Sequence, residues 1–232
     1  AYIDQPNNTT ILGAAKFSGK TKDGLTVGVL ESVTSKEFAD VIDEDGSESE
    51  ELVEPLTNYL VGRIQQDFND NNSYVGGIFT SAIRNMDDNV SFLHSHAYSG
   101  GVDFKHNWQE RTYYVEGSAV VSNVRGSAEA IASTQTSITH LFQRTDADHV
   151  EVDPTRTELT GTGGRFEFGK GGGGDWRYAI GGNFKSPELE LNDIGFLRQA
   201  DDIRQYAVLR RLFNKPTSWY RRANARINLS SA

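Results

Sequence analysis

The connections between the expected strands alternate between short and long along the whole chain. Ten segments with two-residue alternation predict β-strands, each about long enough to cross a bilayer at a tilt. They are Thr10–Ser18, Leu25–Thr34, Asn58–Phe68, Tyr74–Arg84, Tyr98–Phe104, Tyr113–Val121, Arg156–Gly169, Trp176–Phe184, Ile203–Leu212 and Trp219–Leu229. Short turns lie at Lys20–Gly24, Asn69–Asn72, His106–Glu110, Lys170–Asp175 and Asn214–Ser218. Long polar connections lie at Ser35–Thr57, Asn85–Ser95, Arg125–Thr155 and Ser186–Asp202.

This sorting of connections by length constrains the fold. Outer-membrane barrels have tight periplasmic turns and longer extracellular loops, and such a sorting has no reason to arise in a soluble sandwich. We therefore expect an all-β fold, an antiparallel up-and-down transmembrane β-barrel of which about ten strands are present. The strands should form one continuous meander in which each pairs with its neighbours in sequence. Residues 1–232 are expected to form one domain.

Each of the clearer strands separates an apolar from a polar face. Side chains expected to face lipid are Val102, Phe104, Val115, Ala119, Val121, Tyr178, Ile180 and Ile227. Charged side chains on the opposite faces are Lys16, Asp103, Lys105, Glu116, Arg177, Lys185, Arg204, Arg222 and Arg226. They would either give a charged lumen that biases solute passage, or pair across strands and with plug elements. Aromatic residues at or near strand ends fit a membrane-interface girdle, namely Tyr59, Trp108, Tyr113, Trp176 and Trp219.

Composition excludes several classes of protein. The chain has 23 basic and 32 acidic side chains, a net charge of -9, which argues against nucleic acid as a partner. It has no Cys, so disulfides and thiolate chemistry are excluded. No run of 18 apolar residues predicts a transmembrane helix, and no signal peptide is visible.

Local motifs do not indicate a catalytic or metal centre. Gly169–Gly174 is followed by Asp-Trp-Arg-Tyr with strand alternation, which predicts a turn and not a phosphate-binding loop. In the acidic stretch 40–54, an EF-hand frame would place Val41 and Leu52 where carboxylates are required. The pair His94 and His96, and the cluster of Asp148, His149, Glu151 and Asp153, have no third ligand at fixed spacing. No catalytic, cofactor-binding or metal-ligating residue is therefore predicted, and no cofactor.

Several stretches resemble a family of Gram-negative outer-membrane proteins. They are 10–25, 27–33, 54–59 with 61–63, 98–104, 169–178 and 186–198. Members of this family have an N-terminal module similar to the family-nine carbohydrate-binding modules, followed by a barrel domain of unassigned function. The resemblance spans roughly residues 4 to 213. It implies that the chain is a segment of the barrel domain, with a module and strands before it and further strands after it.

Three functions stay open. The first is a non-enzymatic outer-membrane barrel, located in the cell outer membrane, with a role in transport, surface glycan binding or an envelope complex. Its partners would be the lipid bilayer, glycans or other envelope proteins. The second is a soluble secreted β-sandwich that binds carbohydrate, which would be monomeric in buffer without detergent. The third is a hydrolase with its site in the long loops, although no Gly-x-Ser-x-Gly motif is present.

Overall fold

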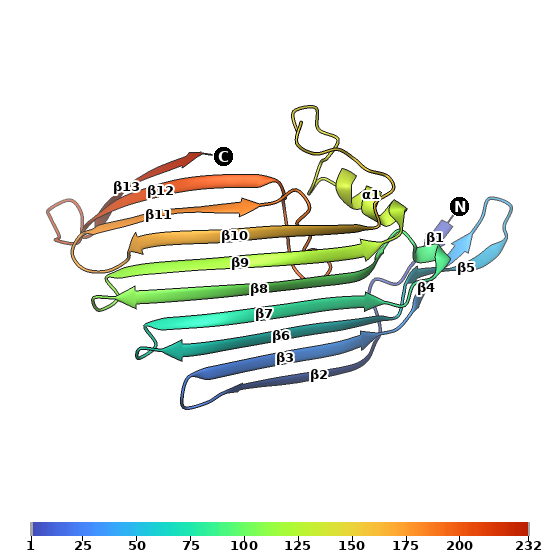
Figure 1. The fold of residues 1–232 in the computed structure, drawn as a ribbon, viewed down its shortest axis with the longest axis horizontal. Helices are drawn as coiled ribbons and strands as arrows, with labels where there is room; N and C mark the ends of the chain where they lie inside the picture. Colours follow the sequence, from blue (N-terminus) through green and yellow to red (C-terminus); the bar gives the residue numbers. More distant parts are fainter. Residues whose placement is uncertain (1, 232) are drawn as a thin grey trace.

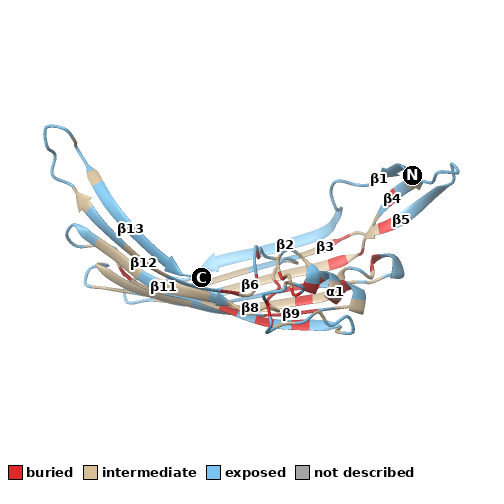
Figure 2. Cartoon of the chain, turned by 90° about the horizontal axis from the view of Figure 1, so that it is seen from above, coloured by how far each residue is buried: buried red, intermediate tan, exposed pale blue. Residues whose placement is uncertain are grey.

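The computed structural model describes residues 2–231 and is dominated by one curved antiparallel sheet of ten strands (Figure 1). The strands are β2 (Ile11–Lys20), β3 (Leu25–Thr34), β6 (Thr57–Phe68), β7 (Ser73–Arg84), β8 (His94–Trp108), β9 (Tyr113–Gly126), β10 (Glu158–Lys170), β11 (Trp176–Lys185), β12 (Asp202–Phe213) and β13 (Ala223–Ser231). Each pairs antiparallel with the next strand of this series, which confirms the all-β fold and the meander. β2 and β13 lie at its two edges, and both edges bend toward the same side (Figure 2). Closure of this sheet into a barrel stays a prediction.

A second, three-stranded sheet projects from one end of the large sheet (Figure 2). It consists of β1 (Tyr2–Asp4), β4 (Glu37–Ile42) and β5 (Glu48–Glu54), in the order β1-β4-β5. Residues 35–57 were expected to form a long polar connection, and this was wrong for most of the segment, which forms β4 and β5. A tight turn with Gly46 at a φ of 80° joins β4 and β5, a conformation that glycine adopts without strain.

The connection between β9 and β10 contains a short helix, α1 (Ala128–Thr136), which was also not predicted. Ser127 caps it, because its side chain accepts a hydrogen bond from the Ala130 N–H. A single turn of 3-10 helix (Asp88–Val90) lies between β7 and β8. Among residues 2–231 no helix is long and apolar enough to cross a membrane. Trp219, expected in the last strand, lies before it, since β13 begins at Ala223.

The register divides the side chains of the large sheet between two faces. Directly paired residues of an antiparallel sheet lie on the same face, and Val102 pairs with Ala119, which pairs with Gly164. By this rule all eight side chains expected to face lipid lie together on one face, here called the apolar face. Its exposed side chains come from all ten strands. They include Phe17, Val29, Ile64, Val75, Phe79, Val102, Phe104, Val121, Phe166, Ile180, Phe184, Ile203, Leu209, Ile227 and Leu229.

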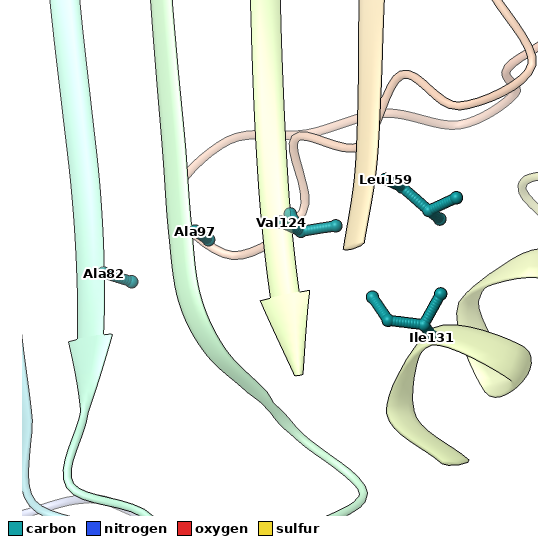
Figure 3. Close-up of a cluster of buried hydrophobic side chains, with 5 residues drawn as sticks. All are labelled: Ala82, Ala97, Val124, Ile131 and Leu159. Carbon is teal, nitrogen blue, oxygen red and sulfur yellow. The ribbon is translucent and has the colours of Figure 1, made fainter. Parts of the chain in front are cut away.

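The buried core lies on the opposite, polar face, near the long connections. Ala82, Ala97, Val124 and Leu159 point from four strands toward Ile131 of α1 (Figure 3). A second cluster joins Leu189, Leu197 and Ala200, from the connection between β11 and β12, to Val120 of β9. Two of the long connections therefore fold onto the polar face.

Candidate functional surfaces

Charged side chains of the polar face form ion pairs between strands, some of them across an intervening strand. Arg63 of β6 forms a two-pronged ion pair with Asp103 of β8, with Nη2 2.9 Å from Oδ2. Lys105 Nζ lies 2.9 Å from Glu116, and Arg165 Nη2 lies 3.1 Å from the same carboxylate. These contacts support cross-strand pairing as the role of the predicted lumen charges. The resulting belt has cations and anions side by side, so it presents no surface of a single sign.

Glu167 of β10 completes this belt. Its carboxylate accepts hydrogen bonds from the Tyr114 hydroxyl at 2.6 Å and from the Tyr206 hydroxyl, and it pairs with Arg165 at 3.1 Å. Gly169 makes room for the first tyrosine, since a Cβ there would lie 2.6 Å from the ring. Four side chains from β9, β10 and β12 therefore satisfy each other, which suits a structural network better than an open binding site.

Among the remaining predicted polar-face charges, Lys16 is exposed on the edge strand β2. Lys185 and Arg204 each lie 3.6 Å from Asp202, so they extend the belt toward β12. Arg177 donates to backbone carbonyls of the Gly173–Trp176 turn, and Arg226 donates to Asn228. Arg222 lies before the start of β13 and is not part of that strand.

A buried network joins the two connections that fold onto the polar face. Asp193 accepts from Arg84 Nη1 at 2.6 Å and lies 2.9 Å from His94 Nδ1, while His94 Nε2 lies 2.7 Å from Thr134 Oγ1. The order of hydroxyl, imidazole and carboxylate resembles a nucleophile activated by a base. Thr134, however, is only 9% exposed, and its hydroxyl donates to the carbonyl of Ala130. A nucleophile must reach substrate, so the network instead ties α1, β8 and the β11–β12 connection together.

Two further histidines lie at the same junction. His140 is buried, with Nε2 3.1 Å from the Leu189 carbonyl and 3.6 Å from Glu190. Burial lowers the pKa of His140, and the nearby Glu190 opposes this only in part, so the neutral imidazole is favoured. His149 pairs with Asp201 at 2.9 Å. Sequence reasoning missed these contacts because the partners lie about fifty to a hundred residues apart in the chain.

The histidine groups considered as metal sites are engaged elsewhere. His94 belongs to the Asp193 network, whereas His96 stacks on Tyr98 with ring centroids 6.2 Å apart. In residues 2–231 no group of three or more His, Asp or Glu side chains could hold a metal ion.

The three-stranded sheet is strongly acidic. Residues 37–54 contain nine acidic and no basic side chains, so this hairpin accounts for the whole excess of 32 acidic over 23 basic residues. Asp4, Asp40 and Glu50 lie directly opposite one another on β1, β4 and β5. Like charges in that position repel and destabilise a sheet. The hairpin is therefore a solvated, negatively charged projection.

Aromatic side chains form two bands on the apolar face. At the end with the short turns, Trp108 stacks on Tyr113, with ring centroids 5.8 Å apart, and its ring centroid lies 6.0 Å from that of Phe168. Phe168 in turn lies beside Tyr178. Toward the other end, Tyr98 stacks on Phe79 at 6.5 Å. Trp176 also belongs to the first band, with the Arg211 guanidinium over its ring. Tyr59 was wrongly assigned to a girdle, because it packs against the core cluster on the polar face.

Comparisons with known proteins give one match. The family model described as "Domain of unknown function (DUF5916)" matches residues 1–232. No curated protein and no solved structure matches the chain. The family match agrees with the expected domain of unassigned function; the outer-membrane location and the neighbouring carbohydrate-binding module stay predictions.

Proposed function

The chain belongs to the DUF5916 family of domains of unknown function, and we propose that it forms part of the wall of a barrel spanning the bacterial outer membrane. The observation that carries this proposal is the apolar face of the ten-stranded sheet. Val102 and Ile180 lie in mid-strand and are 62% and 61% exposed. A soluble sheet buries its apolar face in a core, whereas a membrane barrel turns that face to lipid. Here the core elements lie on the polar face instead.

The spacing of the aromatic bands supports the same orientation. Tyr98 and Trp108 of β8 belong to opposite bands and are separated by about ten residues, or about 33 Å along a strand. At a strand tilt of roughly 40°, this length projects to about 25 Å, the height of the apolar band of outer-membrane barrels. The short turns then face the periplasm, and the long connections with the acidic hairpin face the outside.

The inward face suits a non-enzymatic role. Its charges neutralise one another in cross-strand pairs, and two long connections fill part of the mouth. This arrangement favours a role at the cell surface, in glycan binding or in an envelope complex, or in transport through a regulated path. Further strands would pair with the edges β2 and β13, because an unpaired edge in hydrocarbon costs several kcal/mol per backbone group.

Heat modifiability tests the proposal. The full-length protein is produced in a Gram-negative host, the membranes are separated, and boiled and unboiled samples are compared by electrophoresis. We expect the protein in the outer-membrane fraction, soluble only with detergent, with an unboiled form that migrates faster. A detergent-free soluble monomer would instead support the carbohydrate-binding sandwich.

A further inference from the structure

The connection between β11 and β12 lies across the polar face as a strap, defined here as residues 186–201. None of these residues belongs to a helix or strand. Its first residue is fixed to β10, because the Ser186 N–H donates to the Thr162 carbonyl at 2.8 Å and Ser186 Oγ accepts from the Thr162 N–H at 2.9 Å. Its last residue returns to the same point, where the Asp201 N–H donates to the Ser186 carbonyl at 3.3 Å. The two ends of the strap therefore meet beside Thr162 of β10, and the middle extends over β9 and β10.

Two glycines of β10 leave the space that the strap occupies on the polar face. A Cβ on Gly161 would come within 2.1 Å of the Leu189 nitrogen, and one on Gly163 would come within 2.9 Å of the Leu189 side chain. Neither glycine has a positive φ, so the strand itself does not require glycine there. Leu189 is 1% exposed, and the Glu190 N–H donates to Ser122 Oγ at 3.0 Å. The bare backbone of β10 is therefore shaped to this segment.

The far side of the strap is held by side chains. Asp193 accepts from Arg84 of β7 and contacts His94 of β8, and the carbonyl of Leu189 lies 3.1 Å from His140 Nε2. Between the Ser186 end and this latch no ladder of backbone hydrogen bonds joins the strap to the sheet in residues 2–231. Segments without such a ladder open locally at lower free energy than the sheet beneath them. The strap can separate from β9 and β10 while the ten-stranded sheet stays paired.

We propose that the strap is a gate, held shut by the Arg84–Asp193–His94 latch and seated on Gly161 and Gly163, which closes the inward polar face at its outer mouth. This inference rests on the proposed barrel, because only a barrel makes the polar face a lumen. Release of the latch swings residues 187–200 away from β9 and β10 about the Ser186 end. The mouth then opens with no change in strand pairing.

Gly161→Ala tests the seat of the gate, and Gly28→Ala of β3 is its matched control. Gly28 also lies on the polar face, but a Cβ there meets nothing within 4 Å. Residues 1–232 contain no Cys, so Val120→Cys provides a single thiol under the strap, beside the Leu189 cluster, once any cysteine elsewhere in the full-length protein is replaced. The full-length protein in detergent is labelled with a maleimide, and its ion conductance is measured in planar bilayers.

We expect Gly161→Ala to raise conductance and to speed labelling about tenfold or more, the factor that a loss of about 1.4 kcal/mol from the closed state gives. Gly28→Ala should change neither. Asp193→Asn, which leaves β10 untouched, should act in the same direction as Gly161→Ala and covers the case in which Gly161→Ala does not fold. Unchanged labelling in Asp193→Asn, or faster labelling without higher conductance, would overturn the gate. If the unmodified protein is not heat-modifiable, the barrel itself is refuted, whatever the variants show.

Discussion

Replacing Ile180 with Arg tests whether the apolar face of the sheet meets lipid or water. Ile180 lies in the middle of β11, paired with Phe168 and Ala207 on the apolar face, and is 61% exposed. Full burial of an Ile side chain is worth about 1.5–3 kcal/mol, so covering its exposed part with lipid contributes about 1–2 kcal/mol. Arg forfeits that contribution and also brings a charge into hydrocarbon. The expected total is about 2–4 kcal/mol near the bilayer midplane.

The matched control is Ser118→Arg, which places the same side chain on the polar face. Ser118 is exposed and lies between Asp103 and Arg165 in the register, so an Arg there meets the charged belt. Its cost should be well below that of Ile180→Arg. The assay is a urea titration of the full-length protein folded into lipid vesicles. The folded fraction at each urea concentration is measured from the intensity of the faster-migrating, unboiled band. An exposed position on a soluble protein changes stability by only about 0.5 kcal/mol. A cost of that size for Ile180→Arg, or the reverse order of the two variants, would refute the assignment of faces.

Two further predictions concern the connections that fold onto the polar face. Ile131→Ala removes a fully buried side chain from the core cluster and should destabilise the α1 segment by about 2–5 kcal/mol, whereas Ile138→Ala, at an 87% exposed position, should have little effect. Limited proteolysis of 127–157 compares the two, and equal cleavage would contradict the core assignment. Acid should loosen the strap, because burial lowers the pKa of His140 despite the opposing charges of Glu190 and Glu188, while the charge of His94 adds to the lowering. The stabilisation from neutral His140 is therefore complete above the unfolded pKa of about 6.5, and it is lost as the pH falls through the lower pKa of the folded state. In that pH window, hydrogen exchange of the strap amides, corrected for the intrinsic effect of pH, should rise in the unmodified protein. It should not rise in His140→Gln.

The strands could be predicted from the sequence because their signal is local. Alternation gave β3 with its observed bounds and β7 within one residue, and it also identified which side chains share a face. The face assignment needs only the two-residue period, which each strand contains within itself. That period does not say whether lipid or water covers the apolar face; the position of the core on the polar face is the observation from which lipid is proposed.

Helix α1, the β4–β5 hairpin and the strap were not predicted, because they depend on distant contacts or on weak local signals. Ser127 before an Ala-rich segment is a helix start signal, and Asp45-Gly46 is a hairpin turn signal. Both were obscured by polar composition that resembles a solvated loop. The strap had no such signal, because Asp193 contacts His94 across 99 residues of chain and Leu189 packs over Gly161 and Gly163 of β10.

Site-directed spin labelling along β8 tests the central claim most directly. Residues 1–232 contain no Cys, so single cysteines from Gly101 to Lys105 can be labelled without background in lipid vesicles once any cysteine elsewhere in the full-length protein is replaced. Collision rates with oxygen, which concentrates in hydrocarbon, are compared with those of a water-soluble nickel chelate. We predict a period of two, with oxygen access at Val102 and Phe104 and chelate access or protection at Gly101, Asp103 and Lys105. Preferential access of the chelate to Val102 and Phe104 would show that water covers the apolar face and would contradict the account.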